Sequence, residues 1–328
     1  MDVDEIALLR STVGELTARC TGTQLTNELD AFGWLDILTA EPDAAVPAVF
    51  ESQGLNGSWS SALHDVLAAS LGTDAETVVL LPFPDRDAAA TSESSTINVH
   101  GLLLGARPEY RNILASTTAH EGTTQLVAVS ASDVDVEQLH GLDSGVDAWA
   151  VRGKVLRTKL IAEDHDSSRQ WDRALANGRW AVSHQLVGVM TTMQDLALAH
   201  ALERKQFNRM IGSFQAVRHR LAETHVALEA ARAAAQATRS ASDGGTTPFD
   251  AHFASAMAKL IADRSATKVS AHCQQVLAGI GFTSEHPFQR FMKRAIVLER
   301  ILGDSSQLSR LVGAQIAATG SAPRVIEL

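Results

Sequence analysis

Arg204-Lys-Gln-Phe-Asn-Arg-Met-Ile-Gly-Ser-Phe-Gln215 and Gln275-Val-Leu-Ala-Gly-Ile-Gly-Phe282 are the two stretches that decide how the second half of this chain folds. They interrupt long segments. In those segments a residue pattern repeats every three or four positions, which is the spacing of an amphipathic helix. The residues at this spacing are Val182, Leu186, Val189, Met193 and Leu196, then Val217, Leu221, Thr224, Leu228 and Ala231, then Phe253, Met257, Leu260 and Arg264. Long helices with short connections predict a four-helix bundle.

The first part of the chain, residues 1–74, has the same helical spacing. Apolar residues recur at Ile6, Leu9, Val13 and Leu16, and again at Leu63, Val66, Leu67 and Leu71. Between them we expect the run 32–38 to end in a proline-containing loop. The pattern predicts an N-terminal helical domain.

The central part, residues 75–165, changes to short β-prone runs separated by Pro and Gly. These runs are residues 78–81, 96–99, 102–104, 125–129 and 155–160. We therefore expect an α+β fold that is mainly α, with a small central β-domain between the helical domain and a bundle over 166–328. Inside the bundle, the polar segment 242–250 predicts a helix break, with Thr246 or Thr247 as the next helix cap.

Composition excludes several classes of function. The formal net charge of −10 over 328 residues argues against a general nucleic-acid binder, which needs a basic face. An acidic N-terminus and the absence of a long apolar run predict a cytoplasmic protein with no membrane span. Cys20 and Cys273 form no metal-binding pattern, so we expect two buried thiols and no metal site.

The two opening stretches resemble the FAD-contact segments of acyl-CoA dehydrogenases. The order of a helical domain, a small β-domain and a helical bundle is similar to that family as well, and the resemblance is most specific over residues 200–310. Glycine follows the phenylalanine of the first segment in the family, whereas this chain has Asn208. Because Asn tolerates left-handed backbone angles, the turn can be kept.

The resemblance implies a clamp on the adenosine and diphosphate end of FAD, which a neighbouring subunit holds for the most part. Arg204 would pair with the diphosphate, a role that suits a permanently charged, forked donor. The other implied contacts are hydrogen bonds from Gln206, Gln215 and Gln275, packing by Phe207, Ile211 and Phe214, and close backbone approach at Ala278 and Gly279.

From the residues alone, a plainer interpretation stays open for both segments. The apolar residues of the first segment would then belong to the bundle core, and Arg204 would be a solvated charge. In the second segment, Gly279 and Gly281 would end a helix.

No catalytic residue is expected on this chain, because both family positions for the catalytic glutamate lack a carboxylate. One position aligns with Gly178, and the other aligns with Leu302 or Gly303. Proton transfer needs a base within hydrogen-bond reach of the substrate, and none of these residues can accept a proton. The nearest carboxylates are Asp304, which we expect to cap a helix, and Glu299, which we expect on a solvated face.

The family motifs that contact the flavin ring are missing as well. The corresponding stretches, 81–87 and 105–111, do not match them, and the only tryptophan of the central region is Trp149. The cofactor clamp is thus present without the base or the flavin-ring platform.

This combination favours one subunit of a heteromeric α2β2 acyl-CoA dehydrogenase, like those of bacterial steroid catabolism. The resemblance implies a homologous catalytic partner subunit, an acyl-CoA substrate, and an electron-transfer flavoprotein or similar acceptor. Two alternatives remain at this stage. One is a homo-oligomeric dehydrogenase with a displaced base, and the other is a non-catalytic structural or acyl-CoA-binding protein.

Overall fold

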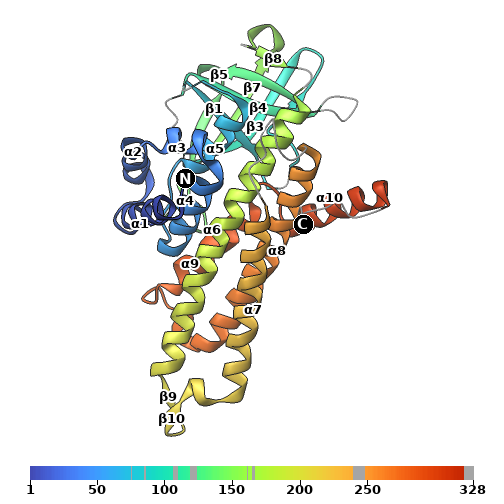
Figure 1. Ribbon diagram of the computed structural model, residues 1–328. Coiled ribbons are helices and arrows are strands. Elements are labelled where there is room, and N and C mark those ends of the chain that lie inside the picture. The colour runs from blue at the N-terminus through green and yellow to red at the C-terminus, as the bar shows by residue number, and fades with distance from the viewer. Residues whose placement is uncertain are drawn as a thin grey trace.

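The computed structural model describes residues 1–74, 76–84, 86–105, 110–118, 124–160, 162–164, 167–238 and 248–320. Helices come first along the chain, a sheet follows, and long helices complete it (Figure 1). This order confirms the expected α+β, mainly α fold with a C-terminal bundle. The exact domain bounds stay a prediction.

The N-terminal helices form a compact group beside the long helices of the bundle (Figure 1). They are α1 (Val3–Arg19), α2 (Gly22–Phe32), α3 (Trp34–Ala40), α4 (Pro42–Asn56) and α5 (Ala62–Leu71). The expectation of a proline-containing loop after residue 38 is wrong, because Pro42 is the first residue of α4. Proline suits that position, since the first turn of a helix leaves its N–H groups without helical partners.

The central sheet follows the order β6-β7-β3-β1-β4-β5-β8, with β2 beside β3 and β4. Its strands are β1 (Thr77–Pro82), β2 (Ala90–Ser92), β3 (Thr96–Leu104), β4 (Asn112–Thr118), β5 (Thr124–Ser130), β6 (Asp135–Leu139), β7 (Ala148–Leu156) and β8 (Ala162–Asp164). The expected strand over 155–160 is wrong in its extent. The strand starts earlier, at Ala148, and ends at Leu156, where a 3-10 turn takes over. Short or polar strands such as β2 and β6 gave too little apolar pattern to be predicted.

The bundle is built on the long helix α6 (Ser168–Glu203), which runs beside α7 (Gln215–Ala237), α8 (Pro248–Leu277) and α9 (Phe288–Arg300). A further helix, α10 (Ser305–Thr319), extends away from it (Figure 1). The predicted caps Thr246 and Thr247 lie outside the described residues. Helix α6 also packs on α4, where Gly54 and Gly188 bring the two backbones together, since a Cβ on either would collide with the other helix.

Both cysteines are free thiols in the interior, as the sequence predicted. Burial raises the pKa of the Cys273 thiol to about 12, so it stays protonated and unreactive at neutral pH. Across the described part of the chain, no helix combines the length and apolar character that crossing a membrane requires.

A single buried arginine joins the three parts of the fold. Arg294 on α9 has no solvent exposure, and its Nε donates to Asp143 Oδ2 of the β6–β7 loop at 2.5 Å. Its Nη1 donates to the Ser58 carbonyl in the α4–α5 connection at 2.6 Å, and its guanidinium lies 5.2 Å from the Trp59 ring centre. One cation therefore ties the bundle, the sheet and the N-terminal helices together.

We expect Arg294→Met to lower the free energy of unfolding by about 3–5 kcal/mol, because it leaves the Asp143 carboxylate buried without its partner. Chemical denaturation followed by circular dichroism measures this loss. Lys293→Gln, on the same helix, is the matched control and should change little. The double variant Arg294→Met/Asp143→Leu should recover much of the stability; equal losses in the single and double variants would contradict the ion-pair explanation.

Candidate functional site

The first predicted segment forms a small hairpin between α6 and α7. Its strands, β9 (Lys205–Gln206) and β10 (Arg209–Met210), are joined by Phe207 and Asn208. Both turn residues have positive φ angles, 51° and 59°. Two consecutive left-handed residues are typical of a tight hairpin turn that favours Asn or Gly. The structure confirms that Asn208 keeps the turn.

The aromatic residues of this hairpin do not form bundle core. Phe207 is 88% exposed, and its ring meets Phe214 edge-on with 6.2 Å between centroids. The Arg209 guanidinium lies 4.0 Å from the Phe214 centroid, within cation–π distance. Only Ile211 packs partly against the core. The hairpin therefore presents an aromatic and cationic surface, with the exposed side chains of Arg204, Gln206 and Gln215 around it.

The second predicted segment spans the end of α8 at Leu277. A 3-10 helix covers Ala278–Phe282, and Ala278 takes the left-handed conformation with φ 54°. The prediction that Gly279 ends the helix is thus wrong, because the left-handed residue after the helix is Ala278, one position earlier. Gly279 is exposed and has no atom within 4 Å of an added Cβ, so its backbone is open to a ligand. Gln275 is exposed one turn earlier.

The fold brings both segments to the same end of the bundle (Figure 1). His200, one turn before the hairpin, lies near Arg204 of the first segment and near His286, which follows the second segment in the chain. Burial lowers its pKa, and the nearby charges of Arg204 and His286 lower it further. Arg204 therefore provides a positive charge at this end, beside the carboxylate of Glu203, and this cation favours an anionic ligand such as a diphosphate.

The two expected base positions meet each other in space. A Cβ on Gly178 of α6 would lie 2.6 Å from Leu302 Cδ1 and 3.0 Å from Leu67 Cδ2 of α5. Leu302 is only 6% exposed and has a φ of 61°, an unfavourable angle for a leucine. Aliphatic side chains therefore pack at the two positions where the resemblance implies that the family keeps its glutamate and where this chain was expected to lack one.

Buried cations hold the Leu302–Gly303 loop in this conformation. Arg179 Nε donates to the Leu302 carbonyl at 2.9 Å, and Lys259 Nζ donates to the Gly303 carbonyl at 3.0 Å. Lys259 also contacts both carboxylate oxygens of Asp263, at 3.0 and 2.9 Å. Burial raises the pKa of Asp263 to about 7, although the lysine charge opposes this shift. Sequence reasoning missed this network, because its members lie far apart in the chain.

The two carboxylates nearest to the loop have other roles. Asp304 Oδ1 accepts hydrogen bonds from the backbone N–H groups of Ser306 and Gln307, both at 2.9 Å. It therefore caps α10, as predicted. Glu299 is half-buried on α9, rather than fully solvated as expected, and its carbonyl accepts from Lys259 at 3.1 Å. Neither geometry provides a displaced base.

The two stretches that correspond to the flavin-ring motifs, 81–87 and 105–111, lie only partly within the described residues, because residues 85 and 106–109 fall outside them. A hollow of about 260 Å³ separates Pro82 and Arg86 from Leu302 and Gln307. Trp149 lies on β7 opposite Leu103 of β3, inside the sheet.

Comparison with known proteins agrees with this geometry. Residues 169–317 match the family model of the acyl-CoA dehydrogenase C-terminal domain. The chain is 35% identical over 159 residues to the probable acyl-CoA dehydrogenase FadE25 of Mycobacterium tuberculosis, which is 47% of this chain and 39% of that protein. The match thus spans about two fifths of this curated relative.

Solved structures resemble the chain over nearly its whole length. A variant of the Tcur3481–Tcur3483 steroid ACAD has a TM-score of 0.79 at 20% identity, covering 97% of this chain and 99% of that one. The ChsE4–ChsE5 complex from Mycobacterium tuberculosis has a TM-score of 0.74 at 19% identity, covering 97% and 98%. The fold is that of acyl-CoA dehydrogenases.

We expect Gly178→Ala to destabilise the protein by about 1–2 kcal/mol, because the new methyl group overpacks the space that Leu302 and Leu67 fill. Leu302→Ala in the same chain should offset part of this cost, so the two changes will not be additive. Thermal and chemical denaturation of the single and double variants measure the coupling. Strict additivity would show that the two positions do not touch.

We also expect stability to fall with decreasing pH through His252. Burial, and next the nearby Arg179 charge, lower the pKa of His252 to about 4. Arg179 Nη1 lies 3.2 Å from His252 Nε2, so the ring accepts and is neutral. Because the unfolded chain binds this proton more tightly, stability present above about pH 6.5 is lost towards pH 4, by at most about 3 kcal/mol.

Denaturation curves between these pH values test the role of His252. His252→Gln should flatten the pH dependence, since glutamine can still accept from Arg179 without titrating. His225→Gln, at an exposed position of α7, serves as the control and should leave the dependence unchanged. An unaltered slope in His252→Gln would contradict the assignment.

Proposed function

We propose that this chain is one subunit of a heteromeric FAD-dependent acyl-CoA dehydrogenase, which introduces an α,β double bond into an acyl-CoA thioester. A homologous partner subunit supplies the catalytic base and the flavin-ring platform. The observation that carries this proposal is the packing of Leu302 against Gly178, which fills both base positions with apolar atoms while the cofactor-contact segments stay exposed.

The residues of the two segments fit the adenosine and diphosphate end of FAD seated on the partner. Arg204 is an exposed cation at the end of α6, and Gln206, Gln215 and Gln275 offer exposed amides nearby in their segments. Phe207 and Phe214 offer aromatic surface, Ile211 supports them from the core side, and Ala278 and Gly279 leave backbone accessible. These nine residues form the proposed clamp.

FAD held by these residues and the partner would supply the acceptor for the hydride from the β-carbon of the thioester. The α-proton goes to the partner's base, since no residue at the two base positions of this chain can take it. The part of this chain is to bind and orient. Its buried Arg179 and Lys259 hold the Leu302–Gly303 loop in place through the two backbone carbonyls. An electron-transfer flavoprotein or similar acceptor completes the proposed reaction.

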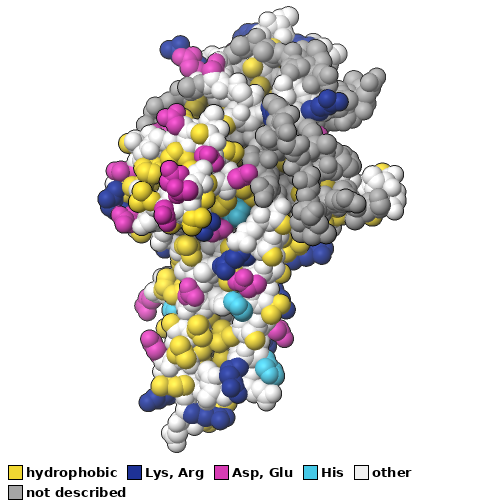
Figure 2. All heavy atoms as spheres, viewed as in Figure 1, with side chains coloured by type: hydrophobic (Ala, Val, Ile, Leu, Met, Phe, Trp, Pro, Cys, Tyr) yellow, Lys and Arg dark blue, Asp and Glu magenta, His cyan; other side chains and the backbone are white. Residues whose placement is uncertain are grey.

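The surface of the bundle supports association with a partner chain. Figure 2 shows apolar side chains gathered on the lower half of the bundle. Exposed large apolar residues on α6, the hairpin, α7 and the second segment are Leu198, Leu202, Phe207, Met210, Val226, Ile280 and Phe282. Apolar patches of this kind mark interaction sites. We infer an α2β2 assembly in the cytoplasm, acting on a bulky acyl-CoA.

A steroid-derived acyl group is the finer part of this proposal. It is supported by the likeness to the Tcur3481–Tcur3483 steroid ACAD, at low sequence identity. A non-catalytic acyl-CoA-binding protein of the same fold is the second candidate. It is favoured only by the same filled base positions, and flavin binding separates the two candidates.

Co-expression with a full-length homologous dehydrogenase tests the proposal. We expect about one FAD for each pair of unlike chains, and desaturation of acyl-CoA only by the pair, because the two chains hold complementary parts of one site. Absorbance of bound flavin and an artificial electron acceptor measure these results. Full activity of this chain alone, or of a pair whose partner has lost its glutamate, would contradict the division of roles.

The clamp itself is tested by Arg204→Gln in the same complex, and we expect weaker flavin retention by about tenfold from the loss of one charge-assisted contact. The matched control is Arg220→Gln, since Arg220 is also an exposed arginine but lies on α7 outside the two segments. Equal retention in the two variants would remove Arg204 from the clamp.

A further inference from the structure

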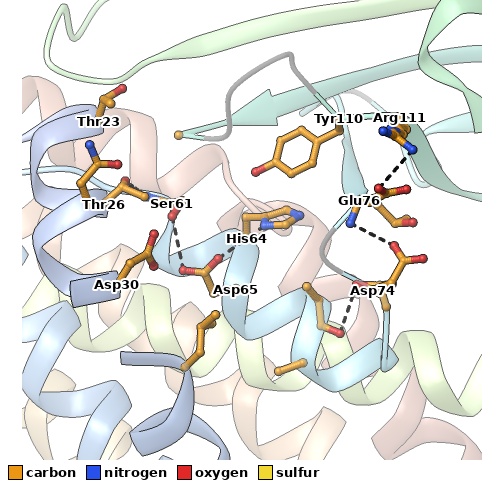
Figure 3. Close-up of a pocket in the computed structure, with 17 residues that line it drawn as sticks. Thr23, Thr26, Asp30, Ser61, His64, Asp65, Asp74, Glu76, Tyr110 and Arg111 are labelled. Atoms are coloured by element: carbon orange, nitrogen blue, oxygen red, sulfur yellow. Dashed lines mark hydrogen bonds and ion pairs between the residues drawn. The ribbon is translucent and has the colours of Figure 1, made fainter. Parts of the chain in front are cut away.

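An acidic cavity of about 620 Å³ lies between α2, α5 and the sheet (Figure 3). Several of its charged side chains are held by groups of the chain itself. Asp65 Oδ2 accepts from Trp34 Nε1 at 3.0 Å and from Ser61 Oγ at 3.3 Å. Arg111 pairs with Glu76 at 3.3 Å. These polar groups satisfy one another, in contrast to a buried cation beside the smaller hollow at Leu302.

This smaller hollow, of about 260 Å³, lies between α6, α10 and the connection that follows β1. Pockets that hold drug-sized ligands measure about 300–1,000 Å³, so the hollow is too small for a flavin or a coenzyme A thioester. It has room for a short molecule with an apolar part, since much of its wall is apolar. The apolar side chains of the wall are Pro82, Trp171, Leu175, Leu302, Leu308 and Leu311.

Arg179 of α6 brings a buried positive charge to this hollow. It is only 6% exposed, and its two hydrogen-bonding partners are neutral. Nε donates to the Leu302 carbonyl at 2.9 Å, and Nη1 lies 3.2 Å from His252 Nε2. The carboxylate of Asp172 acts on Arg179 from farther away, because the His252 ring lies between them, with Nδ1 3.7 Å from Asp172 Oδ1. Among the described residues, no carboxylate pairs directly with this guanidinium.

The remaining nitrogen of the guanidinium, Nη2, is open to the hollow. It makes no hydrogen bond to the described residues, and it is not among the fully enclosed polar atoms of the fold. A Cβ on Gly303 would lie 3.9 Å from Nη2 and 3.2 Å from Leu308 Cδ2, and both of these residues line the hollow. Gly303 has a φ of 107°, which glycine adopts readily, so the wall has no side chain at this point.

Positive charge prevails in the wall as a whole. The exposed residues Arg86 and Arg310 line the hollow together with Arg179, whereas Asp87 is the carboxylate among the lining residues. Burial lowers the pKa of Arg179 to about 10, although the charge of Asp172 opposes this shift, so the side chain stays protonated at neutral pH. Burying a charge without a counter-ion costs free energy, which a bound anion would offset.

We propose that this hollow binds a short-chain carboxylate. The carboxylate accepts a charge-assisted hydrogen bond from Arg179 Nη2, and the alkyl part packs against Leu308 and Leu311. The exposed Arg86 and Arg310 attract the anion. A more highly charged anion such as phosphate loses more hydration at an apolar wall and gains no packing there. The site shares no residue with the flavin clamp, so its occupation requires neither flavin nor a partner chain.

Isothermal titration calorimetry of the full chain with three small probes tests the proposal. Butyrate is an anion with an alkyl part, butyramide is its neutral counterpart of similar shape, and inorganic phosphate is an anion without an apolar part. We expect butyrate to bind at least about tenfold more tightly than either of the others, because it alone satisfies both the guanidinium and the apolar wall. Binding of butyramide or phosphate as tight as that of butyrate, or no binding of butyrate, would overturn the proposal.

Variants locate the binding to the hollow. Leu311→Trp fills it from a half-buried position of α10 and should abolish butyrate binding; Val226→Trp, at an exposed position of α7, is its control. Arg179→Gln keeps a donor for the Leu302 carbonyl and should weaken binding at least about tenfold in protein with unchanged circular dichroism. Arg220→Gln is the control for this loss of charge. Unchanged affinity in Leu311→Trp, or an equal loss in Val226→Trp, would place the binding elsewhere and refute the site.

Discussion

Removing the guanidinium of Arg294 from water is possible only because three separate parts of the chain supply its partners. The β6–β7 loop gives the Asp143 carboxylate, and the α4–α5 connection gives the Ser58 carbonyl and the Trp59 ring. A buried charge tolerates little displacement of its partners, so it sets α9, α5 and the sheet in one relative position. Both the filled base site and the acidic cavity lie against α5, and so depend on this arrangement.

The helical bundle separates two kinds of surface along its length. At one end, Phe207 and Arg204 stand exposed on a tight hairpin turn, ready for a ligand that another chain holds. Near the sheet, Leu302 is pressed against Gly178 and held by buried cations. A group of exposed apolar side chains marks an interaction surface, whereas a buried leucine is already shielded from water. The contrast favours a chain that completes a partner's site and has closed its own.

Much of this was predictable where the signal is local. Helical spacing predicted α6 and α7, Asp304 was predicted as a cap, and the tolerance of Asn208 for positive φ indicated that the turn after Phe207 can be kept. Prediction failed at Pro42, which reads equally as a loop residue or as a helix start. It failed at Ala278 because glycine is preferred for a left-handed residue but is not required. It also missed β6, whose side chains are mostly exposed and give no apolar alternation.

The sequence by itself determined the order of a helical part, a β-part and a helical bundle, the place of the two segments in the chain, and the lack of a carboxylate at either base position, because these depend on residue type and spacing. Only the tertiary structure decided that Gly178 and Leu302 touch, that Arg179 and Lys259 lie beneath the loop, and that α2 and α5 enclose an acidic cavity. Such contacts join residues far apart in the chain. Their formation depends on how whole helices pack, which no local pattern records.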